Sequence, residues 1–168
     1  MIVVLMGVAG AGKTAVGERL AARLGWAFHD GDDLHPEANV RKMAAGEPLT
    51  DEDRRPWLEA VGAVLARHER DGTDAIVACS ALQESYRRTL LAAAPSARFV
   101  YLRGDRALLE RRLRRRKGHF FPTHLLASQL ATLEEPDAAV AAVVDVDAPL
   151  EVVVDRVVAA LRPNRNPR

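Results

Sequence analysis

The N-terminal stretch of this chain restricts its possible folds more than any other part. An apolar run, Ile2 to Met6, leads directly into the sequence Gly7-Val8-Ala9-Gly10-Ala11-Gly12-Lys13-Thr14. This matches the pattern G-x-x-x-x-G-K-[ST], placed between a strand and a helix as that motif requires. Small residues let successive backbone amides point inward at a helix N-terminus, where they bind the oxygens of a polyphosphate. We therefore predict a P-loop; the alternative is a glycine-rich turn that holds no ligand.

The end of this loop carries two groups suited to a nucleotide. The Lys13 ammonium is expected to reach β- and γ-phosphate oxygens, and the Thr14 hydroxyl is expected to ligate Mg²⁺. We predict that all eight residues from Gly7 to Thr14 bind ATP and that Lys13 is also catalytic. A P-loop by itself is shared by kinases, GTPases, motors and transport ATPases, so it does not select one activity.

Short apolar runs alternate with helical patterns along the rest of the chain. Continuous apolar runs are typical of strands covered on both faces, and they occur at Ile2 to Met6, Trp26 to His29, Ala75 to Cys79, Ala97 to Leu102 and Val143 to Val146. Helical spacing marks Val16 to Leu24, Glu37 to Gly46 and Trp57 to His68. This order predicts an α/β protein with a three-layer α/β/α P-loop NTPase fold, a parallel five-stranded sheet and ligands beyond the carboxyl ends of the strands.

The composition fits one globular domain. The chain has 168 residues, a formal net charge of +1 and a single cysteine, Cys79. We expect one domain over residues 1–161 and a disordered tail over residues 162–168, which lack apolar side chains. The balanced charge and the 5% aromatic content argue against a general nucleic-acid binder. No apolar run approaches the roughly 20 residues of a membrane span, and one core cysteine without an internal partner fits a reducing cytoplasm.

Acidic residues follow the second predicted strand. Asp30 and Asp32 are two residues apart in Phe28-His29-Asp30-Gly31-Asp32-Asp33. We predict that Asp30 holds Mg²⁺ through water with Thr14, and that Asp32 orients a substrate hydroxyl for phosphoryl transfer. The alternative is an Asx turn or a helix cap, because Asp and Gly are ordinary turn residues.

Several blocks further along resemble the gluconokinase family. They are Asp30-Gly-Asp-Asp-Leu-His-Pro-Glu-Ala-Asn-Val-Arg-Lys-Met43, Gly46-Glu-Pro-Leu-Thr-Asp-Glu-Asp-Arg-Arg-Pro-Trp57-Leu58, Cys79-Ser-Ala-Leu82, Tyr86-Arg87, Gly118-His-Phe-Phe121, and Ser128-Gln129 through Glu135-Pro136. The resemblance implies an ATP:D-gluconate 6-phosphotransferase that gives 6-phospho-D-gluconate. It also implies a nucleoside-monophosphate-kinase or shikimate-kinase-like fold, a substrate-binding helical segment at about residues 33–70, a small lid at about residues 112–125, and a homodimer.

Gluconate is a polyol with one carboxylate, so its pocket needs cations together with carboxylates and amides. The matching blocks supply the predicted substrate-binding residues Asp32, His35, Lys42, Arg54, Arg87 and His119, with Asn39 as a further candidate. Arg54 and Arg87 are predicted to bind the carboxylate, because a guanidinium contacts it at two points. The alternatives are surface ion pairs for the cations and a helix cap for His35.

The densest charge lies between Tyr101 and Lys117. By the family match, Arg112 and Arg116 are predicted to contact the nucleotide from the lid, with Arg116 catalytic and His119-Phe120-Phe121 at the lid tip. The alternatives are a solvated helix face or a nucleic-acid surface. The adenine is expected against Asp147-Ala148-Pro149, by analogy with related kinases.

Two positions depart from the family pattern: Gln83 replaces a lysine, and Arg88 replaces an aspartate. They affect only the expected wall near Arg87. Shikimate kinases share the P-loop and the Asp-x-Asp pair but carry a glycine triplet where this chain has Cys79-Ser80-Ala81. A nucleotide-dependent binding module is the non-enzymatic alternative. Ser128, Gln129, Glu134 and Glu135 belong to the resemblance, and no chemical role is predicted for them.

Overall fold

Five parallel strands form one sheet in the computed structural model, which describes residues 1–116 and 123–162. The strands are β1 (Ile2–Met6), β2 (Ala27–Asp30), β3 (Ala75–Ala78), β4 (Arg98–Arg103) and β5 (Ala141–Asp145), in the order β2-β3-β1-β4-β5. The central strand β1 pairs with β3 on one side and with β4 on the other. The predicted parallel five-stranded sheet is confirmed, and each strand begins within two residues of its predicted position.

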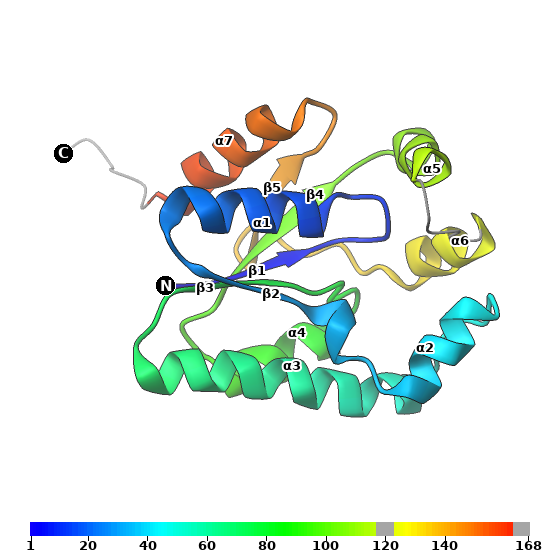
Figure 1. The fold of residues 1–168 in the computed structure, drawn as a ribbon, viewed down its shortest axis with the longest axis horizontal. Helices are drawn as coiled ribbons and strands as arrows, with labels where there is room; N and C mark the ends of the chain where they lie inside the picture. The colour runs from blue at the N-terminus through cyan, green and yellow to red at the C-terminus, as the bar shows by residue number, and fades with distance from the viewer. Residues whose placement is uncertain (117–122, 163–168) are drawn as a thin grey trace.

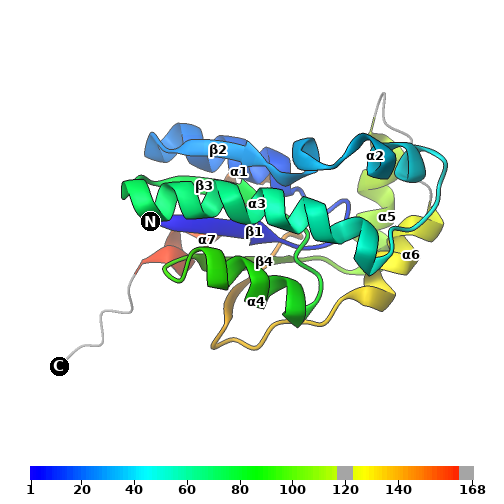
Figure 2. The same ribbon diagram turned by 90° about the horizontal axis from the view of Figure 1, so that it is seen from below.

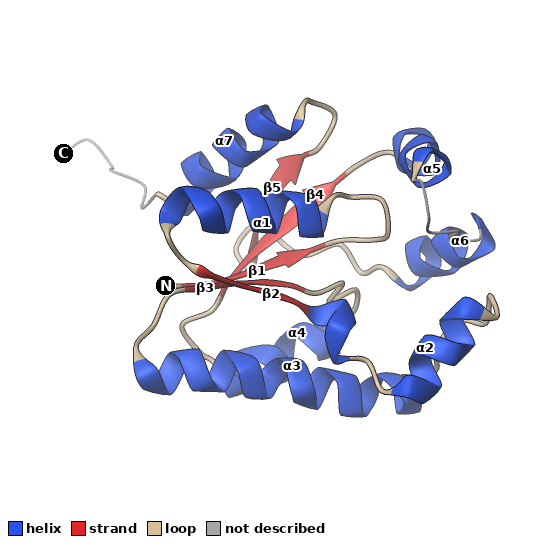
Figure 3. Ribbon diagram, in the orientation of Figure 1, coloured by secondary structure: helices blue, strands red, loops and turns tan. Residues whose placement is uncertain are grey.

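Helices cover both faces of the sheet (Figure 1). Helices α1 (Lys13–Leu24) and α7 (Leu150–Leu161) pack on one face, and α3 (Asp51–Asp71) and α4 (Glu84–Ala93) pack on the other. A buried hydrophobic cluster fills each interface between the sheet and its helices. One cluster includes Leu5, Leu20 and Val154, and the other includes Met6 and Leu65. These layers confirm the predicted three-layer arrangement, which Figure 3 shows by element type.

The remaining elements gather at the carboxyl ends of the strands. They are a 3-10 turn η1 (Gly31–Leu34) and the helices α2 (Glu37–Ala44), α5 (Arg106–Arg115) and α6 (Thr123–Thr132). Figures 1 and 2 both show α2, α5 and α6 at this end of the molecule, beside the loop between β1 and α1. Parallel strands direct all their following loops to one edge, so this edge holds the candidate site.

Helix α3 begins six residues before its apolar stripe. Thr50 forms a capping box in which its side chain accepts from the Asp53 amide at 3.2 Å and its own amide donates to Asp53 at 2.9 Å. Residues 51–56 are charged apart from Pro56, so hydrophobic spacing could not reveal the first turns. The Thr50 capping box determines where α3 begins.

Cys79 is a buried core residue, as predicted, and burial raises the pKa of its thiol to about 12. Among the described residues, no helix has the length and apolar character needed to cross a bilayer. Most of the predicted tail, residues 163–168, lies outside the described residues.

Candidate active site

The loop between β1 and α1 has the backbone geometry that its glycines permit. Gly7 has a φ of 144°, and a Cβ atom there would lie 2.8 Å from the Leu102 carbonyl oxygen of β4. The Gly7 amide donates to the Ser80 carbonyl at 3.2 Å. A side chain at this position would collide with the Leu102 carbonyl oxygen of β4.

Several loop amides are available for a ligand. Within the described part of the chain, the amides of Gly10, Gly12 and Lys13 donate to no protein acceptor, and Gly12, the N-cap of α1, makes no side-chain cap. A helix N-terminus with unpartnered amides favours an anion. This arrangement suits the phosphates of the predicted nucleotide.

The Lys13 ammonium lies against the backbone of the P-loop. Its Nζ donates to the Val8 carbonyl at 3.2 Å. Burial lowers the pKa of Lys13, the carboxylates of Asp32 and Asp30 raise it, and the Arg116 guanidinium lowers it. These charges lie near one another, so the structure brings together residues predicted to act on the phosphates (Lys13 and Arg116), on the magnesium ion (Asp30) and on the acceptor hydroxyl (Asp32).

Asp30 of the acidic pair connects the P-loop to the turn that bears Asp32. The Asp30 Oδ2 atom accepts from the Thr14 hydroxyl at 2.6 Å, and Oδ1 accepts from the Asp32 amide at 3.0 Å. Asp30 is thus the N-cap of η1, which was the structural alternative, and it also faces the P-loop hydroxyl. The Asp32 carboxylate is exposed and free of protein hydrogen bonds among the described residues.

Trp57 of α3 fixes the turn that carries these acids. Its indole Nε1 donates to the Gly31 carbonyl at 2.7 Å. The His35 ring stacks on the Trp57 ring, with centroids 4.5 Å apart and planes 10° from parallel. A Cβ on Gly31 would lie 2.4 Å from the Ala78 carbonyl oxygen, so the turn sits directly on the end of β3.

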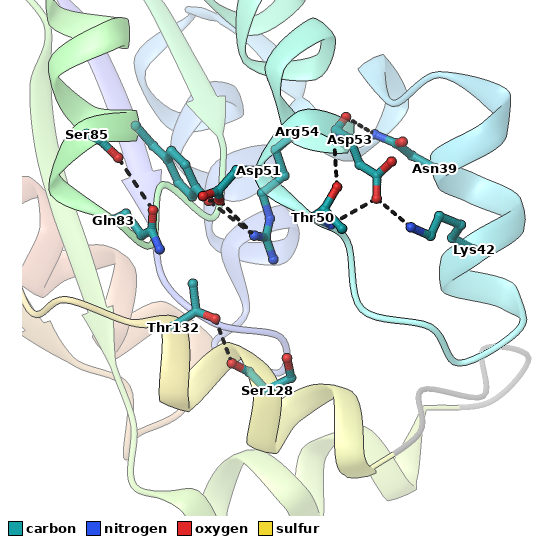
Figure 4. A network of polar contacts seen from close by, with 11 residues as sticks. Asn39, Lys42, Thr50, Asp51, Asp53, Arg54, Gln83, Ser85, Ser128 and Thr132 are labelled. Carbon is teal, nitrogen blue, oxygen red and sulfur yellow. Dashed lines mark hydrogen bonds and ion pairs between the residues drawn. The ribbon is translucent and has the colours of Figure 1, made fainter.

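A polar network joins α2 to the start of α3 (Figure 4). The Lys42 ammonium pairs with Asp53 at 2.6 Å, and this contact holds the pKa of Asp53 low, at about 2. The buried Asn39 amide donates to the Asp53 carbonyl at 2.8 Å and lies 3.2 Å from the His35 ring nitrogen Nδ1. Lys42 and His35 therefore both take part in holding α2 against α3.

The Arg54 side chain is held by Tyr86 and Asp51, two residues of the matching blocks for which the sequence analysis predicted no role. Arg54 Nη1 donates to the Tyr86 hydroxyl at 3.1 Å, and that hydroxyl donates to Asp51. Figure 4 shows the Arg54 guanidinium projecting into the space between α4 and α6, toward Ser128. This chain of contacts joins α3 to α4 and leaves Arg54 about 15% exposed.

Arg87 lies deeper than a surface anion-binding residue. It is 3% exposed, and its Nη1 donates to the carbonyls of Ala81 at 2.9 Å and Leu82 at 3.2 Å. Ala81 has a φ of 43°, unusual for a residue with a side chain. Arg87 thus stabilises the loop after β3, while its buried Nε has no hydrogen-bond partner among the described residues.

The two departures from the family pattern lie beside this loop. Gln83 is the N-cap of α4 without a side-chain cap. Arg88 forms an exposed ion pair with Glu84, one turn earlier in α4. Neither side chain contacts the P-loop or the acidic pair.

Helix α5 lies beside the loop after β5. The Arg112 guanidinium donates to the Val146 carbonyl and lies 4.0 Å from where a Cβ on Gly12 would be. A cavity of about 390 Å³ is lined by Leu108, Arg111, Arg112, Asp147 and Ala148, among others. This is the region expected for adenine. The predicted lid-tip residue His119 lies outside the described residues.

Comparisons with known proteins identify the family of this chain. A family model described as an AAA domain matches residues 2–136. The thermoresistant gluconokinase of Escherichia coli (strain K12) is 49% identical over 155 residues, which cover 91% of this chain and 89% of that protein. The chain belongs to the gluconokinase family.

Solved structures give the same answer for the fold. A gluconokinase from Sinorhizobium meliloti 1021 is 46% identical with a TM-score of 0.87, and the match covers 95% of this chain and 90% of that one. A shikimate kinase from Aquifex aeolicus is only 18% identical with a TM-score of 0.63, covering 96% of each chain. The second match shows a shared fold only. The assignment to the gluconokinase family rests on the first match and on the E. coli relative.

Proposed function

We propose that this protein transfers the γ-phosphoryl group of ATP to the 6-hydroxyl of D-gluconate, giving ADP and 6-phospho-D-gluconate. One observation carries the proposal: Asp30 accepts from the hydroxyl of Thr14, the residue after Lys13, at 2.6 Å and from the Asp32 amide at 3.0 Å, so the turn that bears Asp32 lies against the P-loop. A carboxylate for the acceptor hydroxyl thus stands beside the cation for the phosphates. Gluconokinase relatives that match most of the chain support the choice of gluconate.

The nucleotide side uses the P-loop and α5. The unpartnered amides of Gly10, Gly12 and Lys13 would bind the phosphates. Arg112, already beside Gly12, and Arg116, whose charge acts on Lys13, would neutralise charge on the transferring group. The cavity between α5 and the Asp147-Ala148 loop would hold adenine.

Thr14 and Asp30 fit a magnesium site. A hydroxyl and a carboxylate oxygen meet there at 2.6 Å, and Mg²⁺ prefers oxygen ligands, keeps several waters and is completed by substrate phosphates. When bound, the ion would neutralise charge on the β- and γ-phosphate oxygens. Asp30 remains oriented by the Asp32 amide at 3.0 Å.

The acceptor side uses the turn after β2 and the helices that follow it. The Asp32 carboxylate would orient the 6-hydroxyl and take its proton as the new O–P bond forms and the bond to the β-phosphate oxygen breaks. The Arg54 guanidinium, fixed by Tyr86, would bind the gluconate carboxylate. His35, Lys42, Arg87 and His119 complete the proposed acceptor set.

The wider organisation follows the family resemblance. We infer one kinase domain over residues 1–161, with the acceptor segment at about residues 33–70, a lid at about residues 112–125, and a homodimer. We also infer a cytoplasmic location, because Cys79 is a buried core thiol without an internal disulfide partner. Light scattering of the purified protein tests the dimer.

A coupled assay of ADP release tests the activity. The acceptor panel contains gluconate, shikimate, other sugar acids and AMP, each with magnesium and ATP. We expect turnover with gluconate at least about tenfold above the other acceptors, because a site built to pair polar groups strongly rejects acceptors that leave them unpaired. Turnover with another acceptor and none with gluconate would refute the substrate while leaving the kinase assignment intact.

A further inference from the structure

A side chain of α6 accepts a hydrogen bond from one of the P-loop amides. The Gln129 side-chain carbonyl accepts from the Ala9 amide at 2.7 Å, in a partly buried contact between residues 120 positions apart. Ala9 is the third of the eight P-loop residues. The contact joins the nucleotide-binding loop to α6, a helix far along the chain that packs beside it.

The Ala9 amide differs from its neighbours in the loop. The amide of Ala11 is satisfied inside the loop, by the Val8 carbonyl at 3.3 Å, and those of Gly10 and Gly12 have no protein acceptor within the described residues. Amides without a protein acceptor suit phosphate oxygens. The direction of the Ala9 amide is set instead by a side chain of a distant helix.

Helix α6 is fixed at two further points. The His124 ring hydrogen-bonds to the Gly46 carbonyl, which follows α2. Just after α6, the Glu134 amide donates to the Leu82 carbonyl in the loop after β3 at 2.8 Å. A helix of 10 residues spans about 15 Å as a rigid element. It therefore relates the P-loop to the acceptor side through fixed contacts.

We propose that Gln129 is a positioning residue for phosphoryl transfer: by holding the Ala9 amide it fixes the outer part of the P-loop relative to the acceptor side. Gln129 acts through Ala9, and the inference rests on the proposed function. The amides suited to phosphate do not depend on Gln129, so nucleotide binding should survive its loss. Alignment of the phosphoryl group with the acceptor should be lost with Gln129. A displacement of about 1 Å between reacting groups costs about 100-fold in rate.

Gln129→Met tests the contact, because methionine keeps the length of the side chain and removes the acceptor oxygen. We expect kcat to fall by about 10- to 100-fold, while the Kd for magnesium ATP and the KM for gluconate change by less than about threefold. Amide hydrogen exchange of Ala9, followed by NMR without any ligand, should become at least about tenfold faster. This second readout does not need an acceptor to be known.

Gln129→Glu and Thr132→Val complete the set. The glutamate keeps an acceptor oxygen, so Ala9 exchange should stay slow and kcat should stay within about threefold of the parent value, while repulsion of the phosphates raises the KM for ATP. Thr132 lies on the same helix and, among the described residues, its hydroxyl donates only to the Ser128 carbonyl within that helix, so Thr132→Val should leave every parameter near the parent value.

Three results would overturn the proposal. They are an unchanged kcat in Gln129→Met, a loss confined to magnesium ATP affinity in that variant, and Ala9 exchange that is equal in the parent and in Gln129→Met. A parent protein that phosphorylates an acceptor other than gluconate would refute the substrate alone, and the kcat comparison is then made with that acceptor. The exchange measurement decides the contact in either case.

Discussion

The Thr14 hydroxyl donates to the Asp30 carboxylate at 2.6 Å, which joins the first turn of α1 to the end of β2. The two residues are 16 positions apart. The strands that precede them, β1 and β2, do not pair with each other, because β3 lies between them. Their meeting point therefore depends on the crossover that places β2 at the sheet edge. It brings a hydroxyl and a carboxylate, two hard oxygen ligands, next to the phosphate-binding amides.

Replacing Thr14 tests this pair as a magnesium site. Thr14→Ala removes the hydroxyl, and we expect the magnesium concentration for half-maximal rate to rise by about 10- to 100-fold. Thr14→Ser keeps the hydroxyl and should stay within about threefold of the parent value. Titration of the rate with magnesium at fixed ATP makes the measurement. Equal magnesium dependence in the alanine and serine variants would remove Thr14 from the site.

Replacing Asp32 tests the acceptor carboxylate. Asp32→Asn keeps the size of the side chain and removes its charge, so kcat should fall by about 10²- to 10⁴-fold. The Kd for ATP, measured by calorimetry, should change little. The neighbouring Asp33→Asn is the matched control, because Asp33 is also exposed in η1. Parallel losses of kcat and ATP affinity in Asp32→Asn would indicate a role in metal binding or in folding.

The same substitution to lysine distinguishes the roles of Arg87 and Arg54. Arg87→Lys cannot reproduce the Nη1 contacts with the two carbonyls of the loop after β3. We expect the free energy of unfolding to fall by about 1–3 kcal/mol, and the KM for gluconate to rise at least about tenfold. Arg54→Lys should raise that KM with a smaller loss of stability, because Arg54 is less buried than Arg87. An unchanged KM in Arg87→Lys would leave Arg87 a purely structural role.

A histidine pair away from the site predicts the response of stability to pH. The Nε2 atoms of His29 and His68 lie 2.9 Å apart, and His68 Nδ1 lies 2.7 Å from the Thr73 hydroxyl oxygen. Burial lowers the pKa of both rings, and the Arg67 charge lowers it further. Below the unfolded-state pKa of about 6.5, the unfolded chain then binds more protons than the folded chain.

The free energy of unfolding should therefore decrease as the pH falls from about 7 toward 5. His68→Gln removes one titrating ring of the pair, so its stability should change less over the same interval. Urea unfolding at several pH values makes the comparison. The same slope in the parent and in His68→Gln would show that the pair contributes nothing to the pH dependence.

Much of this arrangement could be predicted from local pattern. The P-loop, the five strands and the acids after β2 are contiguous segments whose spacing or composition has a direct structural cause. Helix α3 shows where the pattern ends: its apolar stripe locates the buried middle, while the start is decided by the Thr50 capping box. Arg87 shows a second limit, because its residue type fits an anion site while its buried position assigns Nη1 to backbone carbonyls.

The sequence by itself determined the phosphate-binding loop, the parallel sheet and the family, because each depends on residues adjacent in the chain or on similarity along it. Only the tertiary structure decided that Gln129 holds the Ala9 amide, that Tyr86 holds Arg54 and that Trp57 holds the Gly31 turn. Each of these contacts joins residues at least 26 positions apart. Such pairs leave no periodic pattern, since their distance is set by the packing of whole helices on the sheet.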